Sequence, residues 1–114
     1  MKVENIKAQM RKGVLELCVL GLLSKETMYP SDIIQNLKKN DLIVVEGTMY
    51  PLLNRLKRDG YLSYNWVESS SGPPRKYYEI TPKGNDLKEE LTKAWENLAQ
   101  TVNFSNSINT TNNE

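Results

Sequence analysis

The 114-residue sequence contains no histidine and only one cysteine, Cys18. Histidine-based acid–base catalysis, Ser-His triads, Cys-His dyads and zinc sites made of histidine and cysteine are therefore excluded together. A single cysteine cannot form a disulfide within the chain, so nothing in the sequence indicates an oxidising compartment. We expect Cys18 to be a small buried apolar residue rather than a redox group.

Other absences narrow the function further. The sequence has neither a GxxxxGK[ST] phosphate loop nor a GxGxxG dinucleotide motif, and its acidic residues are scattered. It has no apolar run close to the roughly 20 residues that span a membrane, and no signal-peptide cleavage pattern follows its N-terminal charges. We therefore predict a soluble cytoplasmic protein that is not an enzyme, with no metal or other cofactor.

Charge gives only a local signal. The net charge is +1, which by itself does not indicate nucleic-acid binding. Any basic surface must come from a few cations that the fold brings together. The cations available for such a surface are Arg55, Lys57, Arg58, Arg75 and Lys76.

The stretch EGTMYPLLNRLKRDGYL, residues 46–62, has the spacing of an amphipathic helix that Gly60 would end. Its polar side is basic, hydrogen-bonding and aromatic, which suits a helix in the major groove of DNA. A solvated basic face is the commoner explanation of such a pattern. The apolar side consists of Met49, Leu52, Leu53 and Leu56, and the opposite side is centred on Gly47, Pro51, Asn54 and Arg58.

Further helices are predicted before and after this segment. The first contains residues 14–23, which are apolar nearly all round and should be buried. Pro30 suits the start of the second helix, while Pro51 either falls in the first turn of the third or kinks it. Thr81 and Pro82 should start the fourth. Its apolar residues recur like those of a coiled-coil seam: Leu87, Leu91, Ala94, Trp95, Leu98 and Val102.

Two strands complete the predicted fold. Residues 61–67 and 75–80 should form a β-hairpin, and ESSSGPP between them suggests a loop too long for a two-residue turn. Residues 42–45 suit a brief strand or a stiff link. The fold class is α+β, mainly α: a winged helix-turn-helix with a C-terminal dimerisation helix. The predicted parts are the winged helix-turn-helix at residues 1–80, the dimerisation helix at 81–102 and a disordered tail at 103–114.

Three motifs resemble the PadR family of bacterial transcriptional regulators. They are RKGVLELCVLGLL in the first helix, EGTMYPLLNRLKRDGYL in the third, and GPPRKYYEITPKG from the hairpin into the last helix. This resemblance implies a homodimeric repressor of the short subgroup, whose C-terminal helix pairs with its copy alongside the first helix. The chain departs from the family at Pro30, Ser31 and Asp32, where a glycine and a second aromatic are usual, so no role is carried over to the second helix.

The resemblance and the helical geometry each contribute site residues. The residues expected at DNA are Thr48, Tyr50, Pro51, Arg75 and Lys76 by resemblance, and Asn54, Arg55 and Arg58 by geometry. Those expected at the dimer interface are Ile6, Met10, Leu87, Leu91, Trp95 and Leu98. The predicted partners are thus double-stranded DNA and a second copy of the chain, and no membrane.

Trp95 has a further implied role. In some short members of the family, a tryptophan of the last helix faces a cavity at the dimer interface and stacks on flat aromatic drugs. Trp95 matches that position approximately, which implies a small aromatic effector, although aromatic residues are common at interfaces without any ligand. For the chain as a whole, the alternative to DNA binding is a winged helix that serves only as a protein-interaction module.

Overall fold

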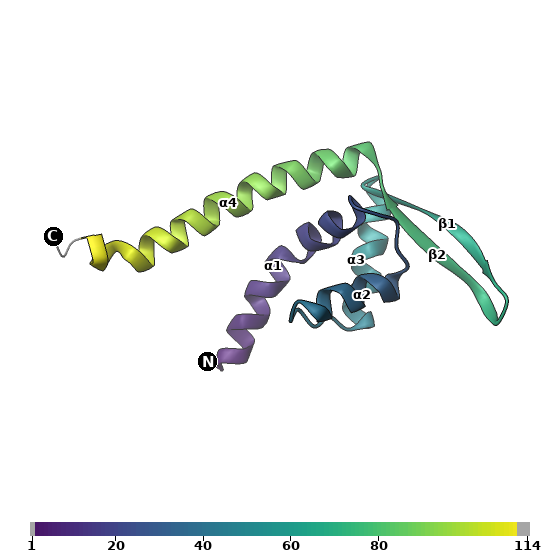
Figure 1. The fold of residues 1–114 in the computed structure, drawn as a ribbon, viewed down its shortest axis with the longest axis horizontal. Coiled ribbons are helices and arrows are strands. Elements are labelled where there is room, and N and C mark those ends of the chain that lie inside the picture. Colours follow the sequence, from purple (N-terminus) through teal and green to yellow (C-terminus); the bar gives the residue numbers. More distant parts are fainter. Residues whose placement is uncertain (1, 112–114) are drawn as a thin grey trace.

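The computed structural model describes residues 2–111 (Figure 1), which form four helices and a two-stranded antiparallel sheet. The order of these elements confirms the predicted fold, a mainly helical winged helix-turn-helix that continues into a C-terminal helix. The elements are α1 (Val3–Leu23), α2 (Pro30–Lys39), α3 (Glu46–Arg58), β1 (Leu62–Ser69), β2 (Gly72–Ile80) and α4 (Pro82–Thr111).

The core lies where α1, α2 and α3 meet the base of the hairpin. The second half of α1 contributes four buried residues, as its apolar run predicted, and α3 contributes the four apolar residues of its predicted inner side. Tyr78 of β2 is buried against them, and its backbone pairs with that of Met28 before α2. The hairpin is therefore fixed to the helices at its base.

The hairpin differs from the prediction at its tip. Ser69 pairs with Gly72, so only Ser70 and Ser71 connect the strands. The predicted long loop is wrong, because both strands continue towards the tip. The register shifts between Val67 and Ser69, opposite the two consecutive prolines of β2, which have no N–H to donate to a regular ladder.

A tight junction joins the hairpin to α4. The Thr81 hydroxyl donates to the Gly60 carbonyl oxygen over 2.7 Å and accepts the Gly84 N–H over 3.0 Å, which confirms Thr81 as the cap of α4. Gly60 has a φ of +86°, as expected for the residue that ends α3. At Gly84 a side chain would collide with the Tyr61 carbonyl oxygen.

Two segments that the sequence left open are now defined. Residues 42–45 form a link without regular structure rather than a strand. Helix α3 begins at Glu46, so Pro51 lies beyond its first turn, yet the helix continues through it to Arg58. Because Pro51 has no N–H, the Gly47 carbonyl oxygen loses its usual partner within the helix.

Helix α4 is longer than predicted. It continues to Thr111, so the expected disordered tail is wrong for residues 103–111, and residues 112–114 lie outside the described part of the chain. Within this added stretch the Ser105 hydroxyl donates to the Thr101 carbonyl oxygen over 2.9 Å, a local bond that does not by itself favour a helix. Figure 1 shows α4 leaving the body of the domain on the side away from the hairpin tip.

Candidate functional site

The outer side of α3 is exposed along its whole length. Pro51, Asn54 and Arg58 all lie on it, directly opposite the buried Met49 and Leu53. Arg58 makes its only ion pair among the described residues with its neighbour Asp59, at 3.4 Å, and its side chain stays largely exposed. A proline ring, an amide and a guanidinium are thus presented together on one helix face.

One edge of α3 faces the hairpin across a groove of about 300 Å³, which we call the wing groove. It is lined by Pro30 and Ser31 from α2, Tyr50 from α3, and Trp66, Pro74, Arg75 and Lys76 from the hairpin. Tyr50 and Trp66 leave 44% and 61% of their surface exposed. Three of the predicted DNA-contacting residues therefore meet here: Tyr50, Arg75 and Lys76.

Two lysines lie against aromatic rings of the hairpin, one of them the wing-groove residue Lys76. Lys76 Nζ lies 4.7 Å from the ring centre of Tyr64 and 5.5 Å from that of Trp66, and Lys57 Nζ lies 5.6 Å from that of Tyr64. Lys57 was named among the cations available for a basic surface but not among the expected DNA contacts, and Trp66 was in neither set. Their signals in the sequence were the place of Lys57 beside Tyr50 on the helix and the alternation that puts Trp66 on the face of Tyr64.

Arg75 is held in a defined position. Its guanidinium carbon lies 3.8 Å from the ring centre of Tyr29, and its Nη2 donates to the Ser31 hydroxyl over 2.9 Å. The Tyr29 ring in turn packs against Tyr77, with ring centres 4.7 Å apart. These contacts connect the hairpin to the start of α2, and no local pattern in the chain predicts that the two segments meet.

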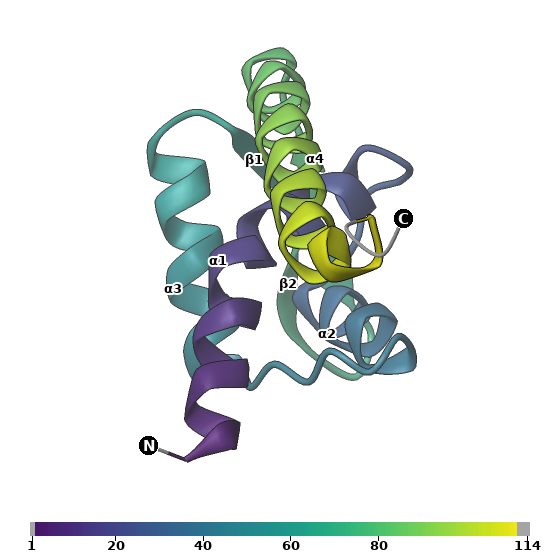
Figure 2. The ribbon, with the colours of Figure 1, turned by 90° about the vertical axis from the view of Figure 1, so that its left-hand side faces the viewer.

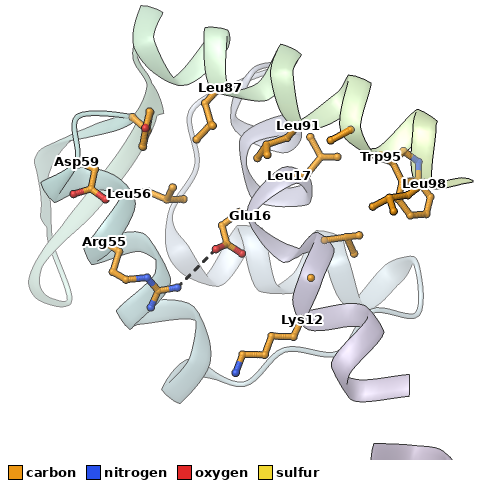
Figure 3. A pocket seen from close by; sticks show the side chains of 14 residues that line it. Lys12, Glu16, Leu17, Arg55, Leu56, Asp59, Leu87, Leu91, Trp95 and Leu98 are labelled. Carbon is orange, nitrogen blue, oxygen red and sulfur yellow. Dashed lines mark ion pairs between the residues drawn. The ribbon is translucent and has the colours of Figure 1, made fainter. Parts of the chain in front are cut away.

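The opposite edge of α3 faces α1. Arg55 Nη2 lies 3.9 Å from Glu16 Oε2, with both side chains about half exposed (Figure 3). Thr48 borders a hollow that it shares with Arg11 and Lys12 of α1. The structure therefore places Thr48 and Arg55 apart from the wing groove, on the side of α3 that adjoins the N-terminal helix.

A second groove, of about 460 Å³, lies between α1, α3 and α4, and we call it the seam groove. Figure 3 shows Leu87, Leu91, Trp95 and Leu98 of α4 on one side of it, above Leu17 and Glu16 of α1. Leu87 and Leu91 are half-buried against the chain's own core, so part of the predicted dimer seam is covered within one copy.

The rest of the predicted dimer surface is uncovered. Trp95 and Leu98 are 48% and 61% exposed, and Val102 continues the same line along α4. On α1, Ile6 and Met10 are also exposed, Met10 by 70%. Figure 1 shows the start of α1 and the end of α4 both lying away from the hairpin tip, and Figure 2 shows these two ends well separated on the face turned to the viewer.

Two side chains, those of Tyr78 and Cys18, have pKa values raised above their ordinary range. Burial raises the pKa of the Tyr78 hydroxyl, and the negative charges that Tyr64 and Tyr50 would carry raise it further. Burial also raises the pKa of the Cys18 thiol. Within residues 2–111, no three acidic or cysteine side chains gather as a metal site would require. None of the helices in that range combines the length and apolar character needed to cross a membrane.

Comparisons with known proteins agree on one family. A model of the "Transcriptional regulator PadR-like family" matches residues 19–93. The chain is similar to "Transcriptional regulator Rv3488" of Mycobacterium tuberculosis, at 29% identity over 82% of this chain and 87% of that protein. It is also similar to an uncharacterised protein of Lysinibacillus sphaericus, at 27% identity over 87% of this chain and 94% of that protein.

Solved structures are similar over most of the chain. A PadR-like transcription factor from Bacteroides fragilis is 62% identical, with a TM-score of 0.74 over 87% of this chain and 96% of that one. A PadR-like regulator from Bacillus cereus is 42% identical, with a TM-score of 0.74 over 83% and 93%. A PadR family regulator from Eggerthella lenta is 31% identical, with a TM-score of 0.83 over 89% and 88%.

Proposed function

Because the chain belongs to the PadR-like family of transcriptional regulators, and is thus a DNA-binding regulator, we propose that it is a sequence-specific homodimeric repressor that acts in the cytoplasm. The observation that supports this most is the position of the wing groove. Tyr50 of α3 lines this groove with Arg75 and Lys76 of the hairpin. Lys57 of α3 also lies against Tyr64 of the hairpin, so cations of the helix and of the hairpin lie near each other.

The outer side of α3 is proposed to enter the major groove. Asn54 is suited to pair with an adenine edge, while Arg58 can bind either a guanine edge or a phosphate. The start of the helix brings Thr48, Tyr50 and Pro51 to the same duplex. Lys57, Arg75 and Lys76 then bind phosphates on either side, which positions the helix without reading bases.

The uncovered apolar line on α4 supports a homodimer. Trp95, Leu98 and Val102 are exposed on a 30-residue helix, which would be about 45 Å long and projects beyond the domain. An exposed apolar line of this kind marks an interaction surface. A second copy would cover it by symmetry, together with Ile6 and Met10 of α1. The two α3 helices would then read half-sites about 34 Å apart.

The seam groove supports a proposal for release from DNA. Trp95 borders it with its ring half exposed, and apolar residues from three helices form its walls. A flat aromatic molecule could stack on Trp95 there. We expect a planar aromatic cation to quench the fluorescence of the protein, and the quenching to vanish in Trp95→Ala. Quenching that persists in Trp95→Ala but disappears in Trp66→Phe would contradict this site.

The proposal is tested by selecting genomic fragments that the purified protein binds. The affinity of the strongest fragment is then measured for the wild type, Asn54→Ala and Arg58→Ala. We expect each substitution to weaken binding about tenfold, since a good base or phosphate contact is worth roughly 1–3 kcal/mol. A chain that enriches no fragment, but captures another protein through α3, would instead be an interaction module.

A further inference from the structure

The environment of Arg75 differs from that of the other arginines near α3. Tyr29 stacks on its guanidinium, with the carbon 3.8 Å from the ring centre, and the Ser31 hydroxyl accepts one of its N–H groups over 2.9 Å. Tyr77 supports the Tyr29 ring from the same strand that carries Arg75. A long exposed side chain is therefore held on two sides by neighbours from another part of the chain.

Both of these neighbours are electrically neutral. A hydroxyl and an aromatic face fix the guanidinium in place without cancelling its charge. Among the residues whose side chains are described, no carboxylate lies within ion-pair distance of Arg75. Arg55 is the opposite case, because Glu16 faces it at 3.9 Å. Arg75 is thus both positioned and free to bind an anion.

Arg75 lines the wing groove together with Lys76, whose Nζ lies 5.5 Å from the ring centre of Trp66. Two cations at the mouth of one groove suit a phosphodiester, since arginine binds phosphate through two parallel N–H groups and lysine adds a point charge. Fixing the arginine beforehand means that less side-chain freedom is lost when the anion binds.

We propose that Tyr29 and Ser31 are positioning residues, which hold Arg75 for a backbone phosphate of duplex DNA at the wing groove. This inference rests on the proposed function as a DNA-binding protein. Tyr29 and Ser31 themselves need not touch the DNA. Their effect passes through Arg75, so it must disappear when Arg75 is removed.

The test is a double-mutant cycle on the genomic fragment selected by the wild type. We expect Arg75→Ala to weaken binding about tenfold and to make the slope of log K against log salt shallower by about two phosphate contacts, one in each copy of the dimer. Tyr29→Leu and Ser31→Ala should each weaken binding about threefold, a loss of the size that an exposed cation–π contact or hydrogen bond provides. In the Arg75→Ala background, both should have no further effect. Tyr29→Phe keeps the ring and should bind like the wild type.

Each other outcome overturns the inference in a distinguishable way. If Tyr29→Leu and Ser31→Ala bind like the wild type while Arg75→Ala is weak, Arg75 is not positioned by them. If they weaken binding equally with and without Arg75, their role is structural. The thermal stability of each variant is measured alongside. If Tyr29→Leu does not fold, Ser31→Ala alone tests the inference, because Ser31 is exposed and its substitution should not disturb the fold. If the wild type itself binds no DNA, the proposed function is wrong, and the inference about Arg75 falls with it.

Discussion

The two grooves on either side of α3 differ in the groups that lie next to their cationic side chains. In the wing groove, Arg75 and Lys76 lie against aromatic rings and a hydroxyl, which leaves their charges available. In the seam groove, Arg55 faces the Glu16 carboxylate, and apolar side chains of α4 supply the wall. One helix therefore separates a surface suited to phosphate from a surface suited to apolar partners, and each can be changed without the other.

The largest effect is expected where both grooves depend on the same junction. Gly84 packs against the Tyr61 carbonyl oxygen, and Ile80 also lies within the space of an added Cβ. An added methyl group at this position could be accommodated only if the backbone at Tyr61 moved. Gly84→Ala should therefore lower the free energy of unfolding by about 3 kcal/mol. Urea or thermal unfolding measures this loss, which would damage both grooves together.

A matched glycine provides the control for this prediction. Gly21 lies inside α1 with no heavy atom within 4 Å of an added Cβ. Gly21→Ala should therefore stabilise the protein by about 0.5–1 kcal/mol through helix propensity. Equal stabilities of Gly84→Ala and the wild type would contradict the tight junction between hairpin and α4.

The second prediction separates the seam surface from the wing groove. Leu98→Glu places a charge on the exposed apolar line of α4 and should convert the dimer to a monomer, as measured by light scattering or sedimentation. DNA affinity should fall about 100-fold, because two linked reading heads gain roughly 10²–10⁴ over one. Gln100→Glu makes the same charge change at an exposed position off this line and should leave the dimer intact. If the Leu98→Glu variant remained a dimer, the exposed apolar line of α4 would not be the dimer interface.

The third prediction compares the two arginines of α3. Arg58 lies on the outer side with its side chain largely exposed, whereas Arg55 turns towards Glu16. Arg58→Ala should weaken DNA binding about tenfold and remove about two phosphate contacts, one in each copy, from the salt slope. Arg55→Ala should weaken it only about twofold, because Arg55 lies on the edge of α3 that adjoins α1 rather than on the outer side. If Arg55→Ala weakened DNA binding more than Arg58→Ala, the outer side of α3 would not be the side that faces DNA.

The smallest effect concerns α1, which walls only the seam groove. Burial raises the pKa of the Cys18 thiol in the folded state, so the unfolded chain loses this proton first as the pH rises. The contribution of Cys18 to stability is complete below its unfolded pKa and falls as the pH rises towards the folded pKa. At pH 8, iodoacetamide should react roughly tenfold faster with the chain in denaturant than with the folded protein. Cys18 is only partly buried, and equal rates would contradict protection of its thiol by this partial burial.

Local patterns were enough to predict most of the fold. The apolar spacing of Met49, Leu52 and Leu53 fixed the inner side of α3, and Thr81 with Pro82 marked the start of α4. Gly60 marked the end of α3 by its tolerance of positive φ. Each of these signals depends on residues within one or two turns, where the period and the capping chemistry act directly.

Contacts between distant segments were not predictable in the same way. The approach of Arg75 to Ser31 joins positions 44 residues apart, and no local pattern encodes it. The tip of the hairpin was misjudged because its two prolines suggested a loop, whereas they lie where the register shifts. The pairing of Arg55 with Glu16 likewise depends on how α1 crosses α3.

The salt dependence of DNA binding tests the central claim most directly. Lys57, Arg58, Arg75 and Lys76 from two copies would provide up to about eight phosphate contacts, for which affinity falls roughly 10³–10⁵-fold between 50 and 200 mM salt. The wild type should show a fall of this size on its selected genomic fragment. An affinity that stays constant over that range would contradict the assignment of α3 and the wing groove to DNA.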